Sequence, residues 1–158
     1  MMTVTTPTLY DVDYVDWIAE TVARLKAKDF ASLDLENLIE EMESLGRSER
    51  HALSSQWIRV VKHLLKLEAQ PQATDYHNSW VSSILDGVRE ITELVEVSPS
   101  LKNYLRSNEV KWYQKSRQEA SIETRLPQAQ FPESCPYDVL DLIAGNYPES
   151  LRYFFVIE

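Results

Sequence analysis

The side chains with the clearest potential for chemistry are three carboxylates and one imidazole. Glu36, Glu40 and Glu43 recur at steps of four and three residues, so one face of a helix presents all three. In di-metal helical bundles, carboxylates and histidines from facing helices hold the metal ions. A site that joins these carboxylates to His63 is therefore the sharpest enzymatic hypothesis that the sequence offers.

Local spacing favours a plainer interpretation of the same residues. The di-metal motif Glu-x-x-His needs an acidic residue three positions before a histidine. Here Ser48, Val60 and Thr74 stand three positions before His51, His63 and His77. Glu43 has Arg47 four residues later, the spacing of a solvated ion pair on a helix surface. We predict no metal and no cofactor, with Glu36, Glu40, Glu43 and His63 as the alternative ligand set.

Nucleophilic and phosphate chemistry find less support. The chain has only 3 Gly, and it contains neither a Gly-x-Ser-x-Gly elbow nor a glycine-rich phosphate loop. Cys135 precedes Pro136 and has Glu133 nearby rather than a cation, so nothing indicates an activated thiolate. We expect a structural cysteine, and no catalytic residue is identified.

Composition restricts the partners and the compartment. The chain has 158 residues, with 16 basic and 25 acidic side chains and a net charge of -9, which argues against a nucleic-acid partner. No apolar run approaches the roughly 18 residues of a membrane span. The first residues lack the pattern of a signal peptide, and one cysteine cannot form an internal disulfide. We expect an acidic cytoplasmic protein.

The candidate residues lie on a long helical stretch, residues 33–70. Its apolar side chains repeat every three or four residues, and the repeat keeps its phase across Gly46. This predicts one helix from Leu35 to Leu67 with Asp34 as its N-cap, although Gly46 could instead end a first helix. The predicted core positions on this stretch are Leu38, Leu45, Leu53, Trp57 and Leu64.

Three further helices are predicted around the central one. The first runs from Leu9 to about Lys28 and turns Tyr10, Tyr14, Trp17, Ile18, Thr21, Val22 and Leu25 inward. Another is capped by Ser79 and includes Gly87, which allows close helix packing. The last starts at Ser98-Pro99 and ends near Thr124.

The rest of the chain is rich in proline and ends in an apolar run. Pro127, Pro132 and Pro136 predict an extended wrap, anchored by Phe131 and Tyr137 and followed by a short helix that starts at Pro136 and runs through Ile143. The expected fold is an all-α bundle of four main helices, with one long central helix, this wrap and the short helix. We expect a frayed segment over residues 1–8, a single helical domain over 9–144 and an apolar tail over 145–158.

Several separated motifs carry a resemblance to a known family. The segments LDLENLIEEMESLGRSERHAL, HLLK, SW, SPSLKNYL and LPQAQFPESCPY follow one another in this order. Together they resemble domain-of-unknown-function family 29, which is bacterial and largely cyanobacterial. The resemblance extends from about Leu9 to Ile143 and implies a small α-helical protein. It implies no activity, substrate or catalytic residue.

The functional interpretation rests mostly on missing motifs. We favour a protein-interaction or regulatory module with an unknown protein partner; the alternative is a metal-dependent or other enzyme with a site between bundle helices. The strand-prone run from Tyr153 to Ile157 is apolar on an acidic chain. We hypothesise that this tail packs onto a groove of its own bundle or of a second copy, the latter giving a homodimer.

Overall fold

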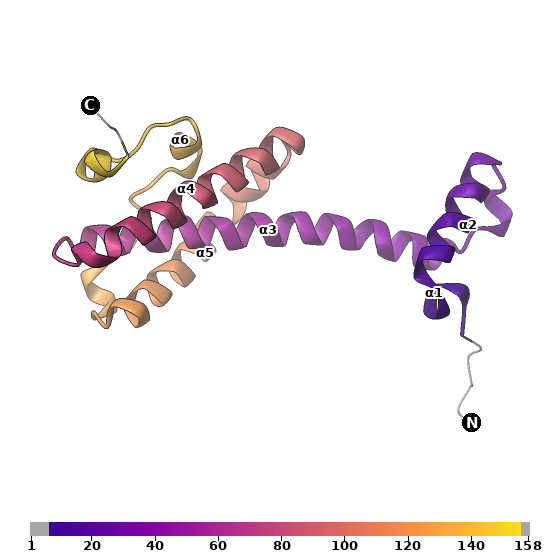
Figure 1. Ribbon diagram of the computed structural model, residues 1–158, viewed down its shortest axis with the longest axis horizontal. Helices are drawn as coiled ribbons and strands as arrows, with labels where there is room; N and C mark the ends of the chain where they lie inside the picture. The colour runs from indigo at the N-terminus through magenta and orange to yellow at the C-terminus, as the bar shows by residue number, and fades with distance from the viewer. Residues whose placement is uncertain (1–6, 156–158) are drawn as a thin grey trace, which may run out of the picture. The chain divides into compact units, whose positions relative to one another are not determined.

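The computed structural model describes residues 7–155, and every regular element in this part is helical (Figure 1). The prediction of an all-α fold is confirmed. Residues 1–6 of the predicted frayed segment and Val156 and Ile157 of the tail lie outside the described residues. The elements are α1 (Leu9–Val12), α2 (Tyr14–Lys26), η1 (Phe30–Ser32), α3 (Leu35–Ala69), α4 (Thr74–Val97), α5 (Leu101–Thr124), η2 (Gln128–Gln130), α6 (Val139–Ile143) and η3 (Glu149–Phe154).

The long helix α3 is continuous through Gly46, as the phase of its apolar repeat predicts. Its start is capped as expected: the Asn37 amide donates a hydrogen bond to the Asp34 carboxylate at 3.3 Å. A Cβ atom added to Gly46 would meet no other atom within 4 Å, so the helix tolerates this glycine in open space rather than requiring it.

The chain forms two compact units, an N-terminal unit of residues 1–47 and a C-terminal unit of residues 48–158. Helix α3 contributes residues 35–47 to the first and residues 48–69 to the second. The expected division into segments 1–8, 9–144 and 145–158 stays a prediction.

The N-terminal unit departs from the predicted single first helix. Asp13 adopts an extended conformation (φ -145°, ψ 90°) that separates α1 from α2. Its carboxylate accepts a hydrogen bond from the Asp16 amide at 3.0 Å, so Asp13 acts as the N-cap of α2. The prediction of one uninterrupted helix from Leu9 is therefore wrong at this residue.

The C-terminal unit holds a continuous apolar core. Helices α4 and α5 flank residues 48–69 of α3, and α6 lies against α4 (Figure 1). A Cβ atom on Gly87 of α4 would lie 2.5 Å from the Cγ2 atom of Val60 on α3, so the close helix approach predicted for Gly87 is confirmed. The most deeply buried large side chains of this core include Leu53, Trp57, Leu64, Ile84, Ile91, Leu105 and Tyr113.

Two helix starts differ from those predicted. Helix α4 begins at Thr74 rather than at Ser79, because Asp75 suits the first turn and the His77 imidazole hydrogen-bonds the Gln70 carbonyl at 3.1 Å. Helix α5 begins at Leu101, two residues after Pro99. The Leu101 amide donates to the Ser98 carbonyl at 3.0 Å, which makes Ser98 and Pro99 part of a turn that precedes the helix.

The proline-rich wrap is held by side chains of α5. The Tyr113 hydroxyl donates to the Pro132 carbonyl at 2.7 Å, and the Arg117 guanidinium donates to the Phe131 carbonyl at 3.0 and 3.2 Å. Phe131 and Tyr137 are both buried, so their predicted role as anchors is confirmed. The short helix α6 starts at Val139 rather than Pro136, since the Asp138 carboxylate caps it.

The described part of the tail is a 3₁₀ helix and packs on its own unit. Leu151 is buried in the core, Phe154 meets the His77 ring edge-on at 5.1 Å between centroids, and Phe155 stacks on Tyr147 at 4.1 Å. The strand tendency is therefore not realised over Tyr153 to Phe155, where Phe154 and Phe155 pack on the core of their own unit. The docking of the tail on a second copy stays a prediction.

Candidate functional site

The predicted ligand residues have other partners in the structure. The Arg47 guanidinium lies 2.7 Å from the Glu40 carboxylate and 3.6 Å from that of Glu43, both exposed on the N-terminal unit. Glu36 is also exposed there, and His63 belongs to the C-terminal unit. Within residues 7–155, no group of three or more His, Cys, Asp and Glu side chains is arranged to hold a metal ion. The assignment of these residues stays a prediction.

The surroundings of His63 favour the neutral form of its imidazole. Burial lowers the pKa of His63, and the ammonium groups of Lys66 and Lys62 lower it further, against the opposing effect of the Arg59 carbonyl. That carbonyl can only accept, so the Nδ1–H of His63 donates to it at 2.7 Å. The cationic neighbours make this histidine a poor partner for a metal ion.

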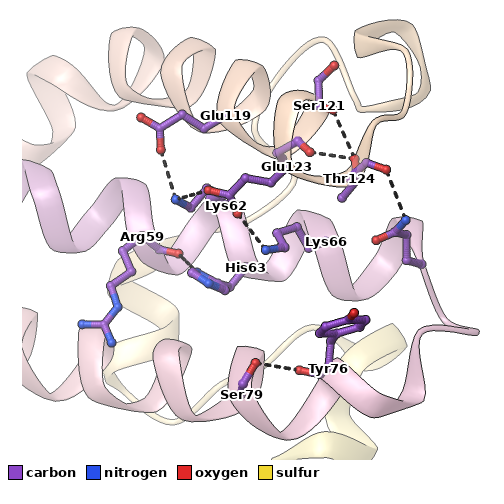
Figure 2. A network of polar contacts seen from close by, with 12 residues as sticks. Arg59, Lys62, His63, Lys66, Tyr76, Ser79, Glu119, Ser121, Glu123 and Thr124 are labelled. Atoms are coloured by element: carbon purple, nitrogen blue, oxygen red, sulfur yellow. Dashed lines mark hydrogen bonds and ion pairs between the residues drawn. The ribbon is translucent and has the colours of Figure 1, made fainter.

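His63 borders an ion-pair network that joins α3 to α5 (Figure 2). Lys62 lies 3.2 Å from the Glu119 carboxylate and 2.8 Å from that of Glu123, and Lys66 lies 2.7 Å from Glu123. Burial raises the pKa of Glu123, but the hydrogen bonds from both lysines outweigh it and lower the pKa to about 2. Burial lowers the pKa of Lys62, and its two carboxylate partners raise it overall. We therefore interpret the network as an ion-pair clamp, a set of salt bridges that holds α3 and α5 together.

A groove of about 450 Å³ lies between α5 and the proline-rich wrap and contains the single cysteine. Burial raises the pKa of Cys135 to about 11, and the carboxylates of Glu109 and Asp138 contribute to the rise, while a hydrogen bond with the Tyr137 backbone lowers it. The thiol is therefore protonated at neutral pH. Asp138 is itself paired with Arg106 at 2.9 Å. The groove offers a protonated thiol and paired ions rather than an activated nucleophile.

The feature that stands out is an apolar surface on the N-terminal unit. Four apolar side chains of α2 and four of α3 remain between 40% and 75% exposed. On each helix they are spaced three or four residues apart, so each set shares one helix face. This N-terminal apolar surface consists of Val15, Ile18, Val22 and Leu25 on α2 and Leu35, Ile39, Met42 and Leu45 on α3.

The N-terminal unit uses a neighbouring face of α2 for its own packing. Trp17 and Thr21 are the buried residues of α2, and the Tyr14 hydroxyl donates to the Glu41 carboxylate on α3 at 2.8 Å. Ile18 and Val22 each follow a buried residue by one position, which is a rotation of about 100° around the helix. The apolar stripe of α2 therefore lies beside the packed face and is left in water.

Sequence reasoning placed several of these apolar residues in the core. It predicted that Ile18, Val22, Leu25 and Leu45 face inward, and all four are exposed. Periodicity identifies the residues that share a face, but it does not identify what covers that face. The unit boundary after residue 47, which leaves too few residues to bury two full stripes, is visible only in the structure.

By its fold, this is an all-α protein with one well-packed helical unit and one helical unit that exposes an apolar surface. The family with the description "Domain of unknown function DUF29" matches residues 9–148, and the chain belongs to this family. No curated protein and no solved structure matches the chain. Over residues 7–155, no helix has the length and apolar character needed to cross a bilayer.

Proposed function

We propose that this chain is a cytoplasmic protein-interaction module, with a regulatory role exerted through binding rather than catalysis. The observation that supports the proposal is the N-terminal apolar surface. Soluble proteins rarely leave a contiguous apolar patch larger than a few hundred Å² in water, and larger ones mark binding sites. Here both helices of one small unit carry an exposed apolar stripe.

The stability of the N-terminal unit supports the same proposal. Among residues 7–47, Trp17 and Thr21 are the side chains classed as buried. A segment of this size with so little core is marginal by itself. Covering the stripes with another protein surface would bury apolar area that the unit cannot bury internally, so binding and stability become linked.

The alternative, an enzyme with a metal-dependent or other site between helices, finds less support among the described residues. Glu40 and Glu43 engage Arg47, and His63 is flanked by two ammonium groups. Metal analysis of the purified protein tests this alternative: about one tightly bound metal ion per chain, lost in His63→Ala, would favour it over the interaction module.

The interaction surface can be tested inside the cell that makes the protein. A photo-crosslinking amino acid is placed at Met42 in one variant and at Ile122, an exposed apolar residue of α5, in a matched control. The expected result is a defined protein adduct at position 42 and none at position 122. Absence of any protein adduct at position 42, with the variant folded and expressed at the same level, would contradict the proposed function.

A further inference from the structure

We propose that the N-terminal apolar surface is covered by the same surface of a second copy of the chain, so that residues 12–45 of two chains form one helical bundle. This inference rests on the proposed function and names the partner. The sequence-based hypothesis located a homodimer contact in the C-terminal tail. The described tail residues Leu151, Phe154 and Phe155 pack on their own unit, whereas the N-terminal apolar surface is exposed.

The area of the surface matches what one subunit of a stable dimer contributes. At about 100 Å² of apolar area for each of the eight side chains, their exposed fractions leave on the order of 400 Å² in water. A standard interface buries about 800 Å² per partner, and somewhat more than half of it is apolar. The eight side chains therefore supply the apolar centre of such an interface, and polar residues beside them supply its rim.

The spacing of the apolar residues suits helix-on-helix packing. Val15, Ile18, Val22 and Leu25 follow one another at steps of three, four and three residues, the spacing of a and d positions in a coiled coil. The α3 stripe follows with steps of four, three and three. Two stripes on each of two copies provide the four helices of a bundle, and a two-fold axis makes the contact self-complementary.

The need for permanent cover favours a second copy over an occasional partner. With Trp17 and Thr21 as its buried side chains, the described part of the N-terminal unit lacks the core to remain folded while uncovered. Obligate interfaces are the apolar ones, and a second copy is always produced in equal amount.

The negative charge of the N-terminal unit opposes dimer formation. Residues 1–47 contain ten acidic and four basic side chains, so two copies repel each other at low ionic strength. The acidic residues Glu20, Glu40 and Glu43 pair with Arg24 or Arg47 of the same unit, which reduces that repulsion. A basic helical peptide would be attracted by the same charge, so salt dependence separates the two occupants.

The test measures the solution mass of the full chain by light scattering over roughly a hundred-fold range of chain concentration. The expected result is twice the chain mass for the wild type, and an increase in the dissociation constant of at least about a hundredfold for I39E/M42E, which places carboxylates of two copies against each other. The matched control V110E/I122E changes two exposed apolar residues of α5 and is expected to stay dimeric.

A mixing experiment tests the geometry. I39E/M42E and I39K/M42K are each expected to be monomeric, and an equimolar mixture is expected to recover the dimeric mass, because acidic and basic surfaces then meet. A dimeric wild type whose charge variants do not pair in the mixture would overturn the proposed contact. The unfolding transition of the C-terminal unit verifies that this unit is folded in each variant, and recovery of the dimer in the mixture verifies that the altered N-terminal units can still fold.

Failure of the dimer and failure of the interaction function are distinguishable. A wild type that stays monomeric throughout, with an adduct to a different protein at position 42, overturns the second copy as occupant and leaves the interaction module in place. A monomer without any adduct at position 42 overturns both. An adduct of twice the chain mass at position 42 supports both.

Discussion

The two units of this protein share the same pattern of apolar residues along α3, but these residues are buried in one unit and exposed in the other. Helix α3 passes through both with one uninterrupted apolar repeat. In the C-terminal unit this repeat is buried: Leu53 is 0% exposed. In the N-terminal unit it remains in water: Leu45, eight residues earlier on the same helix, is 62% exposed. The difference is the number of helices available to cover the stripe.

The comparison assigns different tasks to the two units. The C-terminal unit has the elements of a stable domain, namely a continuous core, a close α3–α4 contact at Gly87 and an ion-pair clamp between α3 and α5. The N-terminal unit has more apolar helix surface than it buries internally. A surface that a unit cannot cover by itself is a surface for association, which is the basis of the proposed function.

The largest effect is expected from one substitution made on each side of the boundary. Leu53→Ala should destabilise the C-terminal unit by about 2–5 kcal/mol, because it removes fully buried methyl groups and leaves a cavity. Leu45→Ala should change the same transition by less than about 0.5 kcal/mol. Urea unfolding followed by tryptophan fluorescence measures both, since Trp57, Trp80 and Trp112 lie in this unit. An equal loss of unfolding free energy in the two variants would contradict the difference in burial between the two units.

Alanine substitutions at the two helical glycines should change stability by an intermediate amount, with opposite signs at the two positions. Gly87→Ala introduces a methyl group 2.5 Å from Val60, and overpacking of this kind costs about 1–3 kcal/mol, more than the helix propensity of alanine returns. Gly46→Ala adds its methyl group in open space and should stabilise the helix by up to about 1 kcal/mol. Thermal unfolding and helical circular dichroism test the pair. A stabilising Gly87→Ala would show that α3 and α4 are not in close contact.

A smaller effect is expected from the ion-pair clamp, and it depends on pH. The pKa of Glu123 is about 2 in the folded protein and 4.5 ordinarily, so its stabilisation is complete above about pH 5 and is lost as the pH falls through 2. Glu123→Gln should cost about 1 kcal/mol at pH 7, since the carboxylate is partly exposed, and clearly less at pH 2, where about half of the carboxylates are protonated.

The matched control is Glu40→Gln in the N-terminal unit, whose ion pair with Arg47 is exposed on both sides. It should leave stability unchanged at either pH. Urea unfolding as a function of pH compares the two variants. A cost for Glu123→Gln that is as large at pH 2 as at pH 7 would contradict the charged clamp.

The smallest effect separates the two units by their response to salt. Added salt screens the repulsion between two acidic N-terminal units, so the dissociation constant of the dimer should fall by about threefold or more between roughly 50 and 500 mM salt. The clamp of the C-terminal unit should weaken slightly over the same range, because its ion pairs are partly exposed. Sedimentation and urea unfolding measure the two responses. Dissociation of the dimer by salt would contradict the proposed apolar contact.

The local features of this protein were determined by the sequence itself. The continuity of α3 across Gly46, the Asp34 cap and the end of α5 at Thr124 all follow from periodicity and capping. These properties depend on residues within a few positions of one another, so they can be recognised in the sequence without knowledge of the fold.

Only the tertiary structure decided which apolar faces are covered and which charges are paired. Leu45 and Leu53 belong to one periodic stripe, so periodicity alone predicts the same burial for both. Lys62 finds its carboxylate partners at Glu119 and Glu123, 57 and 61 residues further along the chain. Burial and ion pairing depend on which distant segments meet. The residues of the candidate interaction surface are exposed because no distant segment within residues 7–155 packs over them.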